Sequence, residues 1–346
     1  MIWLSWRQFR VQAIVGAAIA GVLAIVLVPT GAHLASRYAA AGLTTCHATC
    51  GSLAANFVNS VKFSGDGIIF YAGIALLYLA PAFIGMFWGA PLVSREIESG
   101  TLRLAWNQSV TRGRWIVVKL AVVGLAAAAL TGVLSLLVTW WASPVDTALN
   151  LGSGGNSLFS FNRMDPLVFA ARGVVPLGSA AFALALGVAI GVLVRRTLPA
   201  MAITLVLFAA VQVLVPSVVR PHLLPPATAT APINIGTAGI DIQSDGSGPG
   251  VITVMGSISV PGAWILSEHA VRPDGQPFSA TAPRACLGSN FQPCNTWLAS
   301  LHLRERAIYQ PASQFWPLQW LELGIYLILA AGLGWLSVWQ VRRRRA

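Results

Sequence analysis

Six long apolar runs decide what this chain can fold into. Crossing the roughly 30 Å hydrocarbon core of a bilayer as a helix takes about 20 apolar residues. A backbone inside the bilayer must also satisfy its own hydrogen bonds, so each such run predicts a transmembrane helix. The runs that are long enough are 13–31, 68–92, 116–141, 173–194, 198–219 and 320–340.

The composition agrees with a membrane protein. Hydrophobic residues make up 56% of the 346 residues, charged residues only 10%, and the mean hydropathy is +0.70. A soluble domain carries roughly 25% charged residues. The net charge of +11 does not indicate nucleic-acid binding, because the arginines form short patches between the apolar runs rather than one stripe. We therefore expect the lipid bilayer, and no nucleic acid, as a partner.

The distribution of basic residues predicts the orientation. If the N-terminus is cytoplasmic, the inside segments hold 13 of the 22 lysines and arginines in under a sixth of the chain. This bias predicts cytoplasmic N- and C-termini. A signal peptide beginning with Arg7 and Arg10 is the alternative, but its cleavage would remove one span and so the even number of spans that the charges support. The segments placed inside are 1–12, 93–119, 195–197 and 341–346.

All four cysteines fall in segments predicted to lie outside, where oxidation is permitted. Four cysteines allow three pairings, of which we expect the local ones, Cys46–Cys50 and Cys286–Cys294. Metal binding by Cys46, His47 and Cys50 is the alternative for the first pair. That short loop supplies no fourth ligand, so we expect disulfides and no metal site.

These features predict an all-α polytopic membrane protein in three parts. Residues 1–219 hold an amphipathic N-terminal interfacial helix and spans one to five, with a cytoplasmic loop at 93–115. Residues 220–319 form a large extracytoplasmic loop domain between spans five and six. Residues 320–346 hold the sixth span and a basic cytoplasmic tail.

Local patterns add detail to these parts. The interfacial helix is expected because aromatic residues recur at helical spacing within 3–9, beside arginines. In span four, the spacing of Gly187 and Gly191 lets helix backbones approach closely, either in ordinary packing or in a dimer contact. Within the outside loop we expect a short strand at 251–254 and a helix at 297–308.

The sequence contains none of the common catalytic motifs. It has no GxxxxGK[ST] phosphate loop, no HExxH and no GxSxG nucleophile elbow, so we expect no enzyme and no catalytic residue. Ionisable residues inside a membrane are costly and often functional. The candidate is Glu322, one turn into span six, which is either a functional group or an interfacial acid hydrogen-bonded near Gln319.

The cytoplasmic loop is the most informative segment. Glu96 and Glu98 lie on one helical turn beside Arg95, and Gly100 is suited to end that helix. A short helix with both charge signs at the cytoplasmic surface suits docking of a soluble partner. The alternative is a solvated loop whose arginines only set the topology.

The pattern Arg-Glu-x-Glu-x-Gly-Thr in this loop resembles that of the type-two ATP-binding-cassette (ABC) exporter permeases, also called type V exporters. The resemblance implies that the loop holds the coupling helix that meets an ABC ATPase subunit. Glu96, Glu98, Gly100 and Thr101 would then face the ATPase, with Arg95 beside them. It also implies that ATP and Mg are bound by the partner ATPase rather than by this chain, which needs no cofactor of its own.

A narrower resemblance is to a subgroup of these permeases from high-GC bacteria. It rests on Trp-Arg-Gln-Phe-Arg at 6–10, Phe-Trp-Gly-Ala-Pro-Leu-Val at 87–93 and Tyr-Gln-Pro-Ala-Ser-x-Phe-Trp at 309–316. The resemblance implies that two permease copies pair as a homo- or heterodimer in the plasma membrane.

The expected function is therefore the permease subunit of an ATP-driven exporter that moves amphipathic small molecules, drugs, antibiotics or peptides outward. The outside loop is longer than the short re-entrant pair that the resemblance implies for lipid exporters, and this departure argues against a lipid or polysaccharide substrate. One alternative is a proton-coupled secondary transporter, which would show several acids or histidines at membrane depth. The other is a non-transporting membrane sensor or structural protein whose outside loop binds a ligand.

Overall fold

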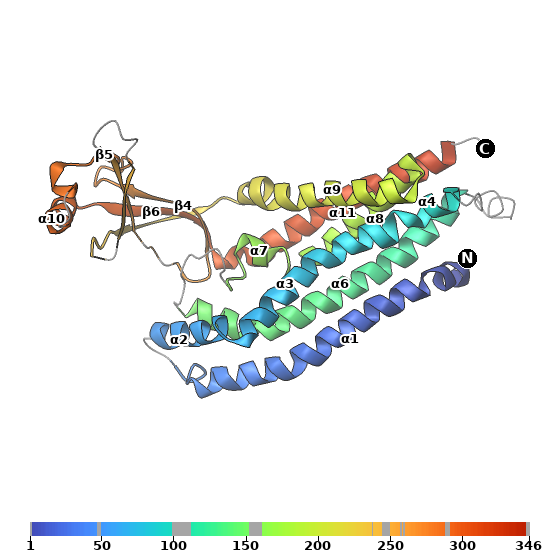
Figure 1. Cartoon of the computed structure of the whole chain (residues 1–346), viewed down its shortest axis with the longest axis horizontal. Coiled ribbons are helices and arrows are strands. Elements are labelled where there is room, and N and C mark those ends of the chain that lie inside the picture. Colours follow the sequence, from blue (N-terminus) through green and yellow to red (C-terminus); the bar gives the residue numbers. More distant parts are fainter. Residues whose placement is uncertain are drawn as a thin grey trace.

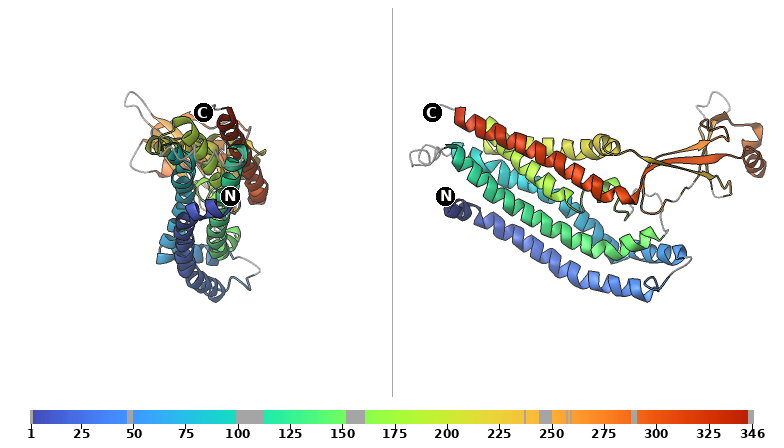
Figure 2. Two further views of the ribbon diagram at one scale, coloured as in Figure 1. Left: turned by 90° about the vertical axis from the view of Figure 1, so that its right-hand side faces the viewer. Right: turned by 180° about the vertical axis from the view of Figure 1, so that it is seen from behind.

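The structure is a computed structural model that describes residues 2–46, 50–98, 112–151, 161–236, 238–243, 250–256, 258, 260–287 and 291–343. These residues form a bundle of long helices with a strand-rich segment at one end, and both ends of the chain lie at the other end (Figure 1). In the rear view, α1 (Ile2–Ala40) runs along one edge of the bundle and α11 (Phe315–Arg343) along the opposite edge (Figure 2).

Six helical segments of the described chain are long and apolar enough to cross a membrane, which confirms the predicted number of spans. Each contains the apolar run expected from the sequence, apart from the first residues of span four, and most extend beyond it. The orientation of these segments in the membrane stays a prediction. The segments are Phe9–Ala40, Gly65–Glu98, Gly113–Asn150, Val175–Val194, Thr197–His222 and Ala312–Arg343.

The second and fifth spans are each assembled from several helical pieces. In the second, α3 contains Pro81, and after Phe83 the helix widens into a π-helical turn before α4 begins. The fifth span ends in the same way, as a π-helical turn with Pro216 followed by a short 3₁₀ turn. Proline removes a helical hydrogen bond, and neighbouring helices or π adjustments compensate for it. The pieces are α3 (Gly65–Phe83), η1 (Ile84–Gly89), α4 (Pro91–Glu98), α9 (Thr197–Leu214), η2 (Val215–Val219) and η3 (Arg220–His222).

The remaining helices are simpler. The segment predicted to form an interfacial helix at the N-terminus is the first part of α1, with no break after it. Its position at a membrane surface stays a prediction. These helices are α2 (Gly51–Lys62), α6 (Arg112–Asn150), α7 (Pro166–Phe169), α8 (Val175–Val194), α10 (Gln292–Ser300), η4 (Arg284–Cys286) and η5 (Ala312–Gln314).

Small residues bring α8 into the centre of the bundle. A Cβ atom built on Gly191 would lie 2.5 Å from the carbonyl oxygen of Ala90, and one on Gly89 would lie 2.7 Å from that of Leu184. A Cβ atom built on Gly187 would lie closer still to the backbone carbonyl oxygen of Gly85. The glycine spacing in span four therefore serves close packing within the chain, against the matching glycines of η1.

Between η3 and η5 the chain forms two antiparallel sheets of three strands, in the orders β1-β6-β4 and β2-β3-β5. The first sheet is joined to the spans directly, because β1 follows η3 and β6 precedes α11. In its register Ala307 of β6 lies opposite both Ala229 and Glu268. The strands are β1 (Ala227–Pro232), β2 (Gly239–Gln243), β3 (Val251–Met255), β4 (Trp264–Val271), β5 (Ala280–Thr281) and β6 (Arg304–Gln310).

The fold is thus mostly helical, but an all-α description leaves these strands out. The strand expected at 251–254 is confirmed as β3, whereas the helix expected over 297–308 is wrong. The helix α10 ends at Ser300, and His302 then adopts a positive φ of 47° that turns the chain. From Arg304 exposed and buried side chains alternate, which is the period of a strand rather than of a helix.

The cysteines pair locally, as expected. Cys46 and Cys50 are joined before α2, and Cys286 and Cys294 are joined where α10 packs on the strands. The second pair is buried in a small core with Ile252, Phe278 and Leu298 among its members. It therefore links α10 to η4 within this core.

Candidate functional site

The helix α4 contains Arg95, Glu96 and Glu98 of the predicted coupling segment, and it lies at the end of the bundle that holds both chain termini (Figure 1). Its Glu96 forms an ion pair with Lys119 of α6. The ammonium group of Lys119 also lies 4.5 Å from the ring centre of Trp115, and the residue is only 4% exposed. A buried ammonium needs such a partner, so this pair fastens α4 to α6.

On its other side α4 is linked to α9. Thr197, the first residue of α9, donates its hydroxyl hydrogen to a carboxylate oxygen of Glu98. The hydroxyl oxygen of Ser94 lies 3.1 Å from that of Thr197. The carboxylate of Glu98 therefore lies at the N-terminus of α9, where a negative charge interacts favourably with the helix dipole.

The predicted coupling residues thus separate into three groups. Both Glu96 and Glu98 bind within the chain, while the side chain of Arg95 is exposed. Gly100 and Thr101 lie outside the described residues. The ATPase-facing role of all five stays a prediction.

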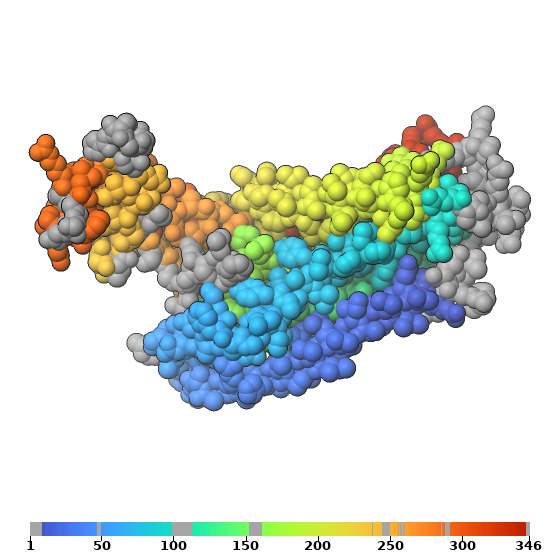
Figure 3. Space-filling view, in the orientation of Figure 1, coloured from blue at the N-terminus to red at the C-terminus, as the bar shows by residue number. Residues whose placement is uncertain are grey.

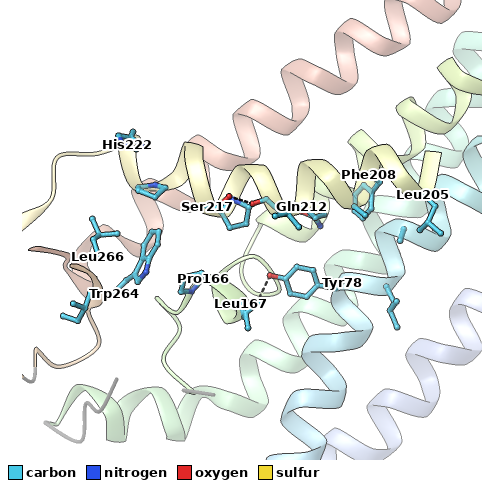
Figure 4. Close-up of a pocket in the computed structure, with 17 residues that line it drawn as sticks. Tyr78, Pro166, Leu167, Leu205, Phe208, Gln212, Ser217, His222, Trp264 and Leu266 are labelled. Atoms are coloured by element: carbon cyan, nitrogen blue, oxygen red, sulfur yellow. Dashed lines mark hydrogen bonds between the residues drawn. The ribbon is translucent and has the colours of Figure 1, made fainter. Parts of the chain in front are cut away.

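A cavity of about 860 Å³ lies near the other end of the bundle, bounded by α3, α7, the end of α9 and β4 (Figure 4). The space-filling view shows α7 at the surface between α9 and α3 (Figure 3). The lining is mostly apolar, and none of the described residues in it is an Asp, Glu, Lys or Arg. The lining residues labelled in Figure 4 are Tyr78, Pro166, Leu167, Leu205, Phe208, Gln212, Ser217, His222, Trp264 and Leu266.

Three polar groups of the cavity are hydrogen-bonded to their neighbours. The hydroxyl of Tyr78 donates to the carbonyl oxygen of Leu167 at 3.0 Å, and the amide oxygen of Gln212 accepts a hydrogen bond from Tyr326 at 2.9 Å. The hydroxyl of Ser217 donates to the backbone of its own helix. Because these groups are already bonded, the cavity offers a mainly apolar surface with few free polar contacts.

A buried ion pair lies next to this cavity, in contact with the lining residue Pro166. Glu322 of α11 and Arg220 of η3 are both fully buried, with Nε–Oε2 and Nη2–Oε1 distances of 2.7 and 3.0 Å. The third nitrogen of Arg220 donates to the carbonyl oxygen of Pro166 at 3.0 Å, and the guanidinium lies 4.3 Å from the ring centre of Phe169. Two parallel hydrogen bonds of this kind are among the strong contacts in proteins.

Gln319 is therefore not the partner of Glu322 that the interfacial alternative suggested. Its amide oxygen accepts hydrogen bonds from the backbone N–H groups of Val174 and Val175, at the start of α8. Its amide nitrogen donates to the carbonyl oxygen of Phe169 at 2.9 Å. Gln319 thus joins α11 to α7 and α8 one turn away from the ion pair.

Sequence reasoning did not identify Lys119, Thr197 or Arg220. Two of them carry a usable pattern, because a lone cation within or at the end of an apolar run needs a carboxylate partner. For Lys119 that partner is 23 residues away, and for Arg220 it is 102 residues away. The sequence indicates that each cation needs a carboxylate partner, but it does not show which carboxylate that is.

The comparisons with known proteins agree with the helical part of this picture. A family model described as ABC-2 membrane transporter related matches residues 17–220, more than half of the chain. The match includes α4 and three of the four cavity walls, and ends before β4 and α11. A search of curated proteins and a search of solved structures each found no match. On the strength of the family match, this chain belongs to the ABC-2 membrane transporter related family.

Proposed function

We propose that this chain is the permease subunit of an ATP-driven ABC exporter, with ATP and Mg bound by separate ATPase subunits. The observation that carries the proposal is the path from α4 to the cavity. Thr197, which binds Glu98, begins the same helix that supplies Leu205, Phe208 and Gln212 to the cavity wall. Family membership supports the same role.

In this proposal the end of the bundle with both termini is cytoplasmic and meets the ATPase. Several basic side chains are exposed there, among them Arg95, Arg114 and Arg196. When the ATPase subunits close, they push on α4. The Glu96–Lys119 pair and the Glu98–Thr197 hydrogen bond then pass the push to α6 and α9.

The cavity supports an amphipathic substrate with a large uncharged part. Pockets for small molecules commonly measure about 300–1,000 Å³ and are mainly apolar, and this cavity is within that range. A group carrying a net charge would find no Asp, Glu, Lys or Arg among the described lining residues. We expect two permease copies in the plasma membrane, with the strand-rich segment facing outward.

Transport in sealed vesicles tests the proposal against the secondary-transporter alternative. We would load proteoliposomes containing the chain and its co-purified ATPase with a fluorescent amphipathic dye and follow its movement. The proposal predicts movement that requires ATP hydrolysis and continues when a protonophore removes the proton gradient. Dye movement that stops when the protonophore is added and that does not require ATP would favour the secondary transporter.

The same preparation addresses the non-transporting alternative. A sensor or structural protein would move no dye under either condition and would tolerate substitution of Glu96 and Glu98. A matched control is Asp274→Asn, which alters a carboxylate in the strand-rich segment, far along the chain from α4. The proposal predicts that Glu98→Gln reduces transport and that Asp274→Asn leaves it unchanged.

A further inference from the structure

The ion pair of Arg220 and Glu322 lies where three parts of the bundle meet. Arg220 belongs to η3 at the end of span five, Glu322 to α11, and Pro166, which accepts the third hydrogen bond of Arg220, begins α7. Both α7 and the η2–η3 segment line the cavity. The guanidinium therefore ties one cavity wall to another and ties both to α11.

Figure 4 shows these two walls from the side. Pro166 and Leu167 lie on one side of the cavity, and Ser217 and His222 lie on the other, along η2 and η3. The wall at 215–222 is built of π and 3₁₀ turns with Pro216 and Pro221, so it lacks the regular hydrogen-bond ladder of an α-helix. Its position thus depends on contacts such as those of Arg220.

Three side chains on one face of α11 act on the same walls. Gln319 binds the backbone of Phe169 and the start of α8, Glu322 binds Arg220, and Tyr326 binds Gln212 of the cavity. Their spacing of three and four residues places them on one stripe of the helix. This stripe fixes α7 and the end of α9 relative to α11.

Stability alone does not account for the ion pair. Removing two charges from water is costly, and replacing a buried pair by apolar side chains of similar volume is often neutral or stabilising. What such a pair does supply is one defined arrangement, since either charge without the other is strongly disfavoured. A device of this kind suits a position where the spacing of two walls matters.

We propose that Arg220 and Glu322 are positioning residues that form a latch and set the width of the cavity between α7 and the η2–η3 segment. The importance of that width for transport rests on the proposed function, whereas the latch itself does not. With the latch closed, α7 is held against η3 and the cavity keeps one width. Without it, the π and 3₁₀ turns relax and the two walls take up a range of separations.

A second buried pair provides a matched control. Arg172, just before α8, binds both carboxylate oxygens of Asp146 in α6, at 2.8 and 2.6 Å. This pair is largely buried, although the side chain of Asp146 is 15% exposed, and neither residue is part of the cavity lining. Its replacement by apolar side chains therefore repeats the chemical change without touching the cavity walls.

The test is a distance measurement between spin labels on the two walls, at Leu167→Cys and Ser217→Cys. Both positions are exposed, and none of the described cysteines is free to react. In lipid nanodiscs the parent protein should give one narrow distance distribution. The variant Arg220→Met/Glu322→Leu should broaden it toward longer distances, whereas Arg172→Met/Asp146→Leu should leave it narrow.

A narrow distribution in the Arg220→Met/Glu322→Leu protein would overturn the proposal, and so would equal broadening in the control. If the double variant does not fold, Arg220→Lys carries the test, because lysine keeps the charge but cannot bind Glu322 and Pro166 in the same fork geometry. It should also broaden the distribution. The measurement needs neither ATPase nor transport, so the latch and the proposed function can fail separately.

Discussion

At the scale of single residues, the described chain pairs its buried cations and leaves one buried acid less well satisfied. Lys119, Arg172 and Arg220 each have a carboxylate partner. In contrast, Glu305 of β6 is only 2% exposed, and one of its carboxylate oxygens has no hydrogen-bond partner among the described residues. Burial raises the pKa of Glu305, and the negative charge of Glu268 raises it further, against a smaller opposing effect of the backbone N–H of Ile258.

This raised pKa predicts that the strand-rich segment is more stable in mild acid. A carboxyl whose pKa is higher in the folded state favours folding when it is protonated. The added stability is complete below the unfolded pKa of about 4.3 and is lost as the pH rises through the folded pKa. Glu305→Gln should remove this dependence and raise the unfolding temperature near neutral pH, because the amide carries no charge to bury.

Thermal unfolding followed by circular dichroism at several pH values measures the effect. Asp241→Asn is the control, since Asp241 is an exposed carboxylate on the neighbouring sheet. It should leave the pH dependence unchanged. If Glu305→Gln unfolds with the same pH dependence as the parent protein, the Glu305 account is wrong.

At the scale of elements, α4 and α8 hold the bundle together in different ways. Polar contacts in the last turn of α4, made by Glu96 and Glu98, join it to α6 and α9. Close backbone packing joins α8 to η1, because glycines of both helices let the carbonyl groups approach. The first kind of contact suits transmission of a push between helices, and the second suits a fixed core.

The contact between α4 and α9 predicts that Thr197→Val separates transport from ATP hydrolysis. Valine has nearly the shape of threonine, but its side chain cannot donate to Glu98 and only the backbone N–H of residue 197 still can, so movement of α4 would no longer reach α9 fully. We expect ATPase binding to persist while the number of dye molecules moved per ATP hydrolysed falls. The measurement is transport and phosphate release in the same proteoliposomes.

Thr204→Val is the matched control, because Thr204 in the same helix donates only to the carbonyl oxygen of Ala200 in its own helix. It should keep the parental ratio. Loss of ATPase binding in Thr197→Val would show instead that this end of α9 contacts the ATPase directly.

The packing of α8 predicts a cost for even one added methyl group. A Cβ atom at Gly187 would overlap backbone atoms of Gly85 and Ala90, which cannot move independently of their helix. We expect Gly187→Ala to destabilise the protein by about 1–3 kcal/mol, the usual cost of overpacking. Gly324→Ala is the control, since nothing lies within 4 Å of a Cβ atom there.

Equilibrium unfolding in mixed micelles measures both glycine variants. The control should be neutral or slightly stabilising, because alanine is the better helix former. Equal stability of Gly187→Ala and the parent protein would mean that α8 and η1 are not packed this closely.

At the scale of the whole molecule, the six spans could be predicted because an apolar run of sufficient length has few other solutions in a chain this poor in charge. Local patterns also sufficed for β3 and for the two disulfides. The prediction of a helix over 297–308 was wrong because the side chains from Arg304 onward alternate between the two faces of a sheet. The partner strands of this segment lie far away in the sequence, at 227–232 and 264–271.

The cavity and its ion pair could not be predicted for a related reason. Arg220 was assigned to the outside loop and Glu322 to a membrane span, and only packing of distant segments brings them together. The same holds for Glu98 and Thr197, which are 99 residues apart. Contacts between distant segments depend on three-dimensional arrangement, and a sequence pattern records only one of the two partners.

Affinity purification of the tagged chain from its native membrane, in mild detergent, is the most direct test of the central claim. The account predicts that a polypeptide with a GxxxxGK[ST] phosphate loop co-purifies in a stoichiometric amount and hydrolyses ATP, and that Thr197→Val leaves this association intact. If no such polypeptide is present, and dye movement by the purified chain depends on a proton gradient instead, the assignment as an ABC permease subunit would be contradicted.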